Sequence, residues 1–273
     1  MDNVLTNLND AIYKLYSVIE KDIYKILDKI VFIDSEIFYD QPLKLILKEE
    51  NTKYIFLVIN IIVFLYFIYF CLFQLITVYN GNKRQSFSLY ILKMIMIILI
   101  VNNSYEMVKS TVNLVSLFTE TSKSICYDIA KEDIQFENLN KNLNSTIELL
   151  NKETMLTNSV FYSIFSYVTI WIFISFSVRY VAIIICIILT PFFIITLLNS
   201  KTKFIFNIWF KYLIIHFIVQ PFINFIIIVP IISKGNSEDS VYHVVLIGTM
   251  FLLYRFNDIL NKIILRKDWY EVN

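Results

Sequence analysis

The chain consists of long apolar runs separated by polar segments. Residues 54–79 carry no charged side chain, and this run exceeds the ~20 residues that a helix needs to cross a hydrocarbon layer about 30 Å thick. The next run, 87–101, is shorter and contains Lys93, whose ammonium group can extend back toward the basic loop before it. Residues 54–101 are therefore predicted to form a first pair of transmembrane spans.

A second apolar region predicts a carboxyl-terminal bundle of spans over residues 158–257. Residues 160–198 are almost continuously apolar, and Arg179 is the only charged residue among them, so two spans that meet in a tight turn at this arginine are expected. Residues 204–232 form the next run. The last run, 241–256, is short enough to be a span, an interfacial helix or a re-entrant segment. About five crossings are expected, or six if the last run also crosses.

The amino-terminal region is amphipathic. Residues 1–31 place apolar side chains at three- and four-residue steps with charged residues between them, which predicts a helix with one polar face. Such a helix packs on the rest of the protein, docks on a partner or lies in the lipid headgroup layer, and the pattern leaves all three open. A looser second helix is expected after Pro42. Residues 1–50 are thus predicted to form extramembrane or interfacial helices.

Charged residues predict the sides of the membrane. Residues 102–157 are polar and mildly acidic, with apolar residues still at helical steps, which predicts an extracytoplasmic helical region. Short basic loops stay in the cytoplasm. Placing the loop that contains Lys83 and Arg84 inside puts the amino terminus outside and Arg179 inside. With five crossings the basic tail, 258–273, is also inside.

The composition makes a membrane protein the default interpretation. Of the 273 residues, 57% are hydrophobic and 17% are charged, with a mean hydropathy of +0.62, which is more apolar surface than one soluble core could bury. A formal net charge of +1 gives no broad field to hold a nucleic-acid backbone. The expected fold class is an all-α, polytopic integral membrane helical bundle with an amphipathic amino-terminal helix.

Polar residues inside the predicted spans are the candidate functional groups. His216, Gln220 and Asn224 are four residues apart and so share one helix face. This face either lines a path for a solute or a proton, or makes hydrogen bonds between helices. Pro191 removes one backbone donor and is expected to kink its helix, with the neighbouring threonine hydroxyl able to compensate. Trp209 is expected to be an interfacial anchor.

The sequence favours no class of enzyme. It contains no G-x-S-x-G or H-E-x-x-H motif, no Gly-rich phosphate loop and no paired intramembrane acids. The three cysteines, Cys71, Cys126 and Cys186, share no C-x-x-C spacing. We therefore expect no catalytic residue, no cofactor and no metal site.

Part of the carboxyl half is similar to a known family. The features that carry the likeness follow one another along the chain: Arg179-Tyr180 at the opening of an apolar helix, Thr190-Pro191-Phe192 at the end of its core, Lys201-Thr202-Lys203 in a polar break, then Phe206, Trp209-Phe210-Lys211 and Gln220. Over roughly residues 160–232 this order resembles the TrbL/VirB-six-like polytopic membrane subunit of type IV secretion and conjugation systems. The small residues usual in that family are replaced here by Ile, Leu and Thr.

The resemblance implies a non-enzymatic channel or scaffold subunit in the cytoplasmic membrane of a bacterium. Its implied partners are the lipid bilayer and other secretion subunits, namely ATPases, a coupling protein and channel proteins, in a homo- or hetero-oligomer that contacts translocated single-stranded DNA only transiently. The implied roles are an inside anchor for Arg179, a kink for Pro191, an interfacial positioner for Trp209 and a pore-facing or interhelical group for Gln220.

Two other classes of protein stay open. One is a permease or the membrane subunit of a small-solute transporter, although the internal repeats with matching helix breaks that this class predicts are not found in the sequence. The other is a membrane anchor that recruits partners through residues 1–31 and 102–157.

Overall fold

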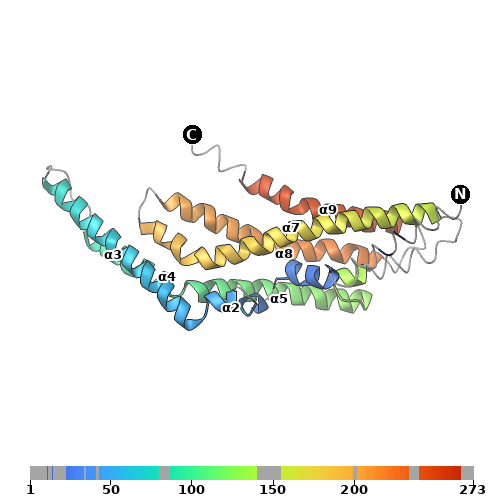
Figure 1. The fold of residues 1–273 in the computed structure, drawn as a ribbon, viewed down its shortest axis with the longest axis horizontal. Helices are drawn as coiled ribbons and strands as arrows, with labels where there is room; N and C mark the ends of the chain where they lie inside the picture. Colours follow the sequence, from blue (N-terminus) through green and yellow to red (C-terminus); the bar gives the residue numbers. More distant parts are fainter. Residues whose placement is uncertain are drawn as a thin grey trace. The chain divides into compact units, whose positions relative to one another are not determined.

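The all-helical fold class is confirmed by the computed structural model (Figure 1), which describes residues 11, 14, 23–33, 35–40, 43–79, 87–139, 155–198, 202–233 and 240–265. None of these residues forms a β-strand. The long helices are α3 (Glu49–Tyr79), α4 (Phe87–Asn102), α5 (Ser104–Ala130), α7 (Met155–Ile195), α8 (Lys203–Ser233) and α9 (Ser240–Leu265). The short elements are η1 (Ser35–Phe38), α2 (Leu43–Ile46) and η3 (Thr196–Leu198).

Several of these helices are long and apolar enough to cross a membrane. Within the described ranges they are Glu50–Phe73 in α3, Ser163–Leu198 in α7 and η3, and Lys203–Ser233. Ile91–Asn102 and α5 pass the same criteria only together, as a pair bent by 56°, and would give a fourth span. The apolar part of α9, Val244–Phe256, is shorter. By the length and composition of its helices, the chain is a membrane protein.

The prediction of two spans within residues 160–198 was wrong. Instead of two spans that meet in a turn at Arg179, a single helix runs from Met155 to Ile195. Neither Gly nor Pro occurs near Arg179, so the local sequence offers nothing to break the helix. The charge is instead accommodated by partners inside the protein. In the same way α9 continues to Leu265, into the segment expected to be a basic tail.

The chain divides into two compact units. Unit 1 consists of residues 1–33, 114–181 and 215–273, and unit 2 of residues 34–113 and 182–214. Each unit is described here by itself.

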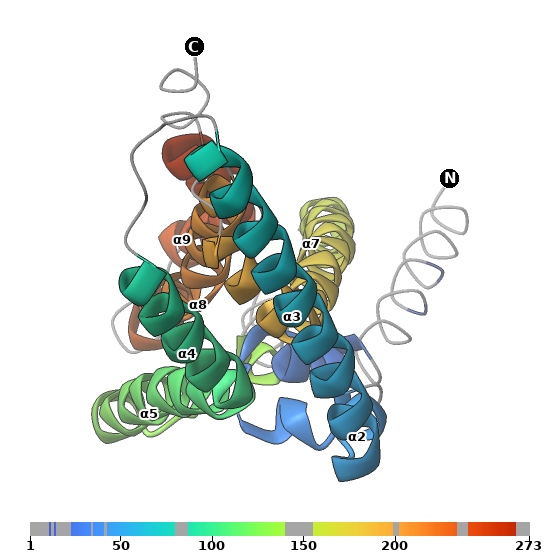
Figure 2. The same cartoon turned by 90° about the vertical axis from the view of Figure 1, so that its left-hand side faces the viewer.

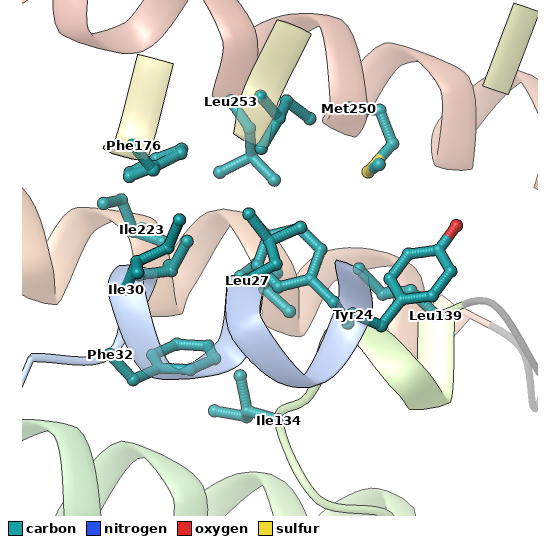
Figure 3. Close-up of a cluster of buried hydrophobic side chains, with 14 of the residues drawn as sticks. Tyr24, Leu27, Ile30, Phe32, Ile134, Leu139, Phe176, Ile223, Met250 and Leu253 are labelled. Carbon is teal, nitrogen blue, oxygen red and sulfur yellow. The ribbon is translucent and has the colours of Figure 1, made fainter. Parts of the chain in front are cut away.

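Unit 1 has a large buried apolar cluster to which the amphipathic amino-terminal segment contributes. Residues 23–31 are helical, and Tyr24, Leu27 and Ile30 on their apolar face are buried. Figure 3 shows these side chains among the following residues of α7, α8, α9 and the segment after α5: Phe176, Ile223, Met250, Leu253, Ile134 and Leu139. Of the three alternatives for the amphipathic helix, packing on the protein itself is therefore the one found for its described part.

Polar contacts secure the same segment. The main-chain N–H of Phe136 donates a hydrogen bond of 2.8 Å to Oδ1 of Asp28. The ammonium group of Lys123 on α5 lies 4.9 Å from the centre of the Phe32 ring. Burial raises the pKa of the Asp28 carboxyl to about 6, and the hydrogen bond from Phe136 and the charge of Lys123 oppose that rise.

The described apolar cluster of unit 2 is smaller. A small cluster joins α3 and α4 to the end of α7 and to η3 through Ile59, Val63, Ile97, Val101, Ile194, Ile195 and Leu198. Figure 2 shows α2 next to the beginning of α3, and α2 itself is a single turn. Only 17% of the apolar window of α3 is buried inside the protein, so most of its apolar side chains face outward. Such a surface requires lipid around it.

Candidate functional site

Arg179 is the centre of a buried polar site in unit 1. It lies inside α7 with only 3% of its surface exposed. Its Nη2 donates to the main-chain oxygen of His216 at 2.8 Å and to Oε1 of Gln220 at 3.0 Å, so the guanidinium group joins α7 to α8. The sequence predicted an interhelical or pore-facing Gln220, and in the structure this side chain makes the interhelical bond.

The third partner of Arg179 is a main-chain group that no sequence pattern reveals. Its Nη1 donates to the carbonyl oxygen of Val31 at 3.4 Å, at the long end of hydrogen-bonding distances. Val31 is the last residue of the helical segment 23–31, and the carbonyl groups at the end of a helix have no amide partner within the helix. A cation is favourable at that position. Arg179 therefore connects three separate segments of unit 1, and we call this arrangement the Arg179 clamp.

The face of α8 that meets Arg179 is the one predicted from the four-residue spacing. His216, Gln220 and Asn224 are all buried, the last two completely. Pro221 lies within α8 beside Gln220 and removes one amide donor from this turn of the helix. The guanidinium group thus lies where the regular hydrogen bonding of α8 is interrupted.

Several polar atoms of this site are buried without a hydrogen-bond partner among the described residues. They are Nε of Arg179, Nε2 of Gln220, and both Nδ2 and Oδ1 of Asn224. Each such atom costs free energy relative to its hydrated state. The hydrogen-bond acceptors described for the guanidinium group are two carbonyl oxygens and one amide oxygen, and no carboxylate is among them.

The chain matches no protein-family model, and neither a curated protein nor a solved structure is similar to it. The site is therefore interpreted from its geometry. Among the described residues there is no group of three or more His, Cys, Asp or Glu side chains placed to hold a metal ion. What the Arg179 clamp can do is hold α7, α8 and the amino-terminal segment in register around a fixed positive charge.

Trp209 lies inside unit 2 rather than on an exposed interfacial surface. Its indole is 6% exposed, and Nε1 donates to the carbonyl oxygen of Cys186 at 3.3 Å. The ring stacks on Phe193 with 5.4 Å between centroids and 17° between planes. The tryptophan therefore packs α8 onto α7 within this unit.

Pro191 lies within α7, in the part that belongs to unit 2. Side chains donate to two carbonyl oxygens in the turn before it. Thr190 Oγ1 bonds to Cys186 at 2.8 Å, and the Tyr105 hydroxyl bonds to Ile188 at 3.2 Å. Of the six predicted site residues, four belong to unit 1: Arg179, its two partners His216 and Gln220, and Asn224 on the same face of α8. Pro191 and Trp209 belong to unit 2.

Lys93 makes a contact that the sequence did not indicate. Its Nζ donates to the carbonyl oxygen of Leu198 at 3.1 Å, whereas the sequence predicted that it would extend toward the loop of Lys83 and Arg84. Leu198 ends η3, so this is again a cation at the carboxyl end of a helical segment. The sequence could not indicate this hydrogen bond, because the acceptor is a main-chain oxygen 105 residues away.

Proposed function

We propose that this protein is a non-enzymatic channel or scaffold subunit of a type IV secretion machine in the cytoplasmic membrane of a bacterium. The observation that supports this proposal is the likeness of residues 160–232 to the TrbL/VirB-six-like subunit, with Arg179, Pro191, Trp209 and Gln220 in the matching order. In this role it assembles with ATPases, a coupling protein and channel proteins, and helps single-stranded DNA and attached protein to cross the membrane.

The structure modifies the membrane topology that goes with this proposal. Lys93 lies near the start of α4 and bonds to Leu198 near the end of α7, which supports a common side for the basic breaks at Lys83–Arg84 and at Lys201–Lys203. With both breaks inside, α7 crosses once and these two breaks obey the positive-inside rule, and the basic tail obeys it as well if α9 also crosses. Arg179 is then an interhelical clamp and has no role as a cytoplasmic loop anchor.

The length of α7 also supports a subunit that extends beyond the bilayer. Its 41 residues correspond to a helix about 62 Å long, which is about twice the thickness of the hydrocarbon layer. Even with the ordinary tilt of about 20°, a large part of α7 lies outside the hydrocarbon. A scaffold subunit presents such helices to neighbouring proteins.

The Arg179 clamp favours a scaffold over a permease. Its guanidinium group is bonded to carbonyl and amide oxygens from two other segments, which fixes those segments relative to each other. A proton or solute path would use polar groups that change partners during transport. The other alternative is a membrane anchor that recruits partner proteins and transports no substrate.

Identification of the co-purifying proteins tests the proposal. The chain is tagged at its carboxyl terminus, extracted in mild detergent, and compared with an unrelated tagged membrane protein from the same cells. Recovery of secretion ATPases or a coupling protein above that control is the expected result. Recovery of a nucleotide-binding transporter subunit would favour the permease, and recovery of the chain alone would contradict a role in a multisubunit machine.

Cysteine labelling tests the revised topology. Cys71, Cys126 and Cys186 are first replaced by alanine, and single cysteines are then introduced as Y79C, K203C and K48C. Tyr79 ends α3, Lys203 begins α8 and Lys48 precedes α3. A membrane-impermeant maleimide should label K48C in intact cells, and Y79C and K203C only after the membrane is opened. Labelling of Y79C and K203C from opposite sides would refute the arrangement.

A further inference from the structure

Unit 2 contains a pocket of about 400 Å³ to which the sequence analysis assigned no role. It is bordered by η1, by the residues around α2, by the first turns of α3, and by the junction of α4 with α5. The wall of the pocket has an apolar part and a polar part. Phe38, Leu47 and Phe56 form the apolar part. The other lining residues carry polar groups: Tyr39, Thr52, Asn102, Tyr105, Glu106 and Lys109. A pocket of this size with a few polar groups is typical of a small-molecule site.

The wall of the pocket is held in place by its own contacts. The rings of Phe56 and Tyr105 lie 5.8 Å apart, and the Tyr105 hydroxyl is bonded to the carbonyl of Ile188. The side-chain amide of Asn103 donates to the carbonyl of Leu99 at 2.8 Å, where α4 ends and the chain bends by 56° into α5. The bend turns the first two turns of α5, which carry Glu106 and Lys109, toward the pocket.

The pocket lies where apolar helices give way to polar sequence. The uncharged run of α3 begins at Tyr54, just after Thr52 of the pocket wall, and the apolar run of α4 ends beside Asn102. Tyr39 and Tyr54 are 65% and 70% exposed, as is usual for tyrosines in the headgroup layer of a membrane. With α4 alone as the crossing and the polar helix α5 outside the hydrocarbon, the polar wall of the pocket is at headgroup depth.

An apolar groove continues from the pocket along α3. It has a volume of about 510 Å³ and is lined by Lys53, Phe56, Leu57, Asn60, Ile61 and Phe64. Phe56 borders both the pocket and the groove, so the two adjoin at this residue. The exposed side chains of Leu57, Ile61 and Phe64 recur at helical steps along the outward face of α3. A polar pocket that opens into an apolar groove has the shape of a lipid site.

The charges identify the kind of lipid. Glu106 and Lys109 are three residues apart on α5, so one anion and one cation lie on the same face at the pocket. The headgroup of an aminophospholipid carries the complementary pair, a phosphate and a primary ammonium joined by two carbons. Aromatic rings such as those of Phe38 and Tyr39 also favour a cation.

We propose that this pocket and groove of unit 2 bind one zwitterionic aminophospholipid, with its phosphate at Lys109, its ammonium at Glu106 and an acyl chain along α3. The site does not depend on the secretion role, because it rests only on unit 2 and on the location of α3 in lipid.

Native mass spectrometry of the full chain in mild detergent tests the site. Phosphatidylethanolamine, phosphatidylcholine and phosphatidylglycerol with identical acyl chains are titrated separately, and the fraction of protein that carries one lipid is measured. Phosphatidylethanolamine should be retained best. Lys109→Gln should weaken its binding by about tenfold, since it removes a charge-assisted hydrogen bond to the phosphate. Glu106→Gln should weaken the binding of phosphatidylethanolamine by a similar factor and leave the binding of phosphatidylglycerol unchanged.

Matched control variants separate the site from the general charge of the surface. Lys44→Gln on α2 and Glu120→Gln on α5 change exposed residues outside the pocket and should leave every titration unchanged. Equal retention of the three lipids, preference for phosphatidylglycerol, or an equal effect of Lys44→Gln and Lys109→Gln would each overturn the proposal. The four variants alter exposed or partly exposed side chains, so they are expected to fold, and their unfolding temperatures check this.

Discussion

The two units differ in where their apolar side chains lie. In unit 1 the apolar side chains of several segments bury one another, and Leu27 of the amino-terminal helix is 0% exposed. In unit 2 the helix α3 presents most of its apolar side chains outward, and Leu57 is 56% exposed. Burial of the amino-terminal amphipathic helix inside the protein adds to the stability of unit 1, whereas α3 of unit 2 depends on surrounding lipid, in which apolar contacts between helices gain little.

The polar contacts differ in the same sense. Unit 1 concentrates them in the Arg179 clamp, where one cation binds to two other segments and some polar atoms have no partner in the part of the chain that the structure describes. Unit 2 distributes them as separate bonds from side chains to main-chain carbonyls, one each at Leu198 and Ile188 and two at Cys186. Removal of one hydrogen bond should therefore change the packing only locally in unit 2, but change the packing of several segments in unit 1.

The largest expected effect tests whether unit 1 is stabilised by its own core. Leu27→Ala should lower the free energy of unfolding of unit 1 by about 2–5 kcal/mol, as large-to-small changes in packed cores do. Ile26→Ala is the matched control, because Ile26 is the neighbouring residue and is 47% exposed. Its effect should stay within about 0.5 kcal/mol. Unfolding titrations in mixed micelles measure both, and equal effects would mean that the amino-terminal helix is not part of the core.

The same contacts determine where a truncation of the amino-terminal segment should end. Deletion of residues 1–31 would remove Tyr24, Leu27 and Ile30 from the core, together with the carbonyl of Val31 that Arg179 binds. A deletion that ends before residue 23 is the sharper test of partner docking, since it leaves the described packing intact.

The second prediction concerns the polar side of unit 1. Gln220→Leu removes an acceptor from the buried guanidinium group and should cost about 1.5–3 kcal/mol, the range for hydrogen bonds to charged groups. Asn224→Leu is of similar shape and removes two buried atoms without partners among the described residues, so it should be neutral or stabilising. Mixed-micelle titrations again give the values. A loss for Asn224→Leu as large as that for Gln220→Leu would mean that Asn224 is engaged in the native protein.

The sequence predicted apolar runs and shared faces well and predicted main-chain partners poorly. The run at 54–79 and the face of His216, Gln220 and Asn224 follow from hydropathy and from the helical repeat, which are local properties. The turn at Arg179 was wrong because a charged residue in an apolar run has two solutions, a loop in water or a partner inside the protein. Only the tertiary structure reveals the second, since the acceptors are carbonyl oxygens present at every residue.

A smaller effect is expected from the pH dependence of Asp28. Its pKa of about 6 lies above the ordinary value of 3.8, so between these values the folded state binds more protons than the unfolded state. The stability of unit 1 should therefore rise as the pH falls from 7 to 4, by about 2 kcal/mol, and change by less than that below pH 4. D28N keeps an oxygen for the N–H of Phe136 and should abolish the dependence, with a gain at pH 7.

Hydrogen exchange of residues 23–31 across that pH range, corrected for intrinsic exchange rates, measures this effect. D128N alters an exposed carboxyl on α5 and is the control, which should keep the dependence of the unaltered protein. If the stability of D28N still rises as the pH falls toward 4, the pH dependence belongs to a group other than Asp28.

The smallest effect on stability is expected from Pro191→Ala in unit 2. The substitution restores one amide donor to α7, while the bonds to Cys186 and Ile188 from Thr190, Trp209 and Tyr105 stay in place. The amount in the membrane and the unfolding free energy should change by little, within about 1 kcal/mol, because each neighbouring carbonyl keeps its donor. Pro230→Ala in α8 makes the same change in unit 1. If Pro191 shapes α7 for assembly, recovery of partner proteins falls for Pro191→Ala at unchanged abundance, whereas loss of the chain from the membrane would make this proline a folding residue.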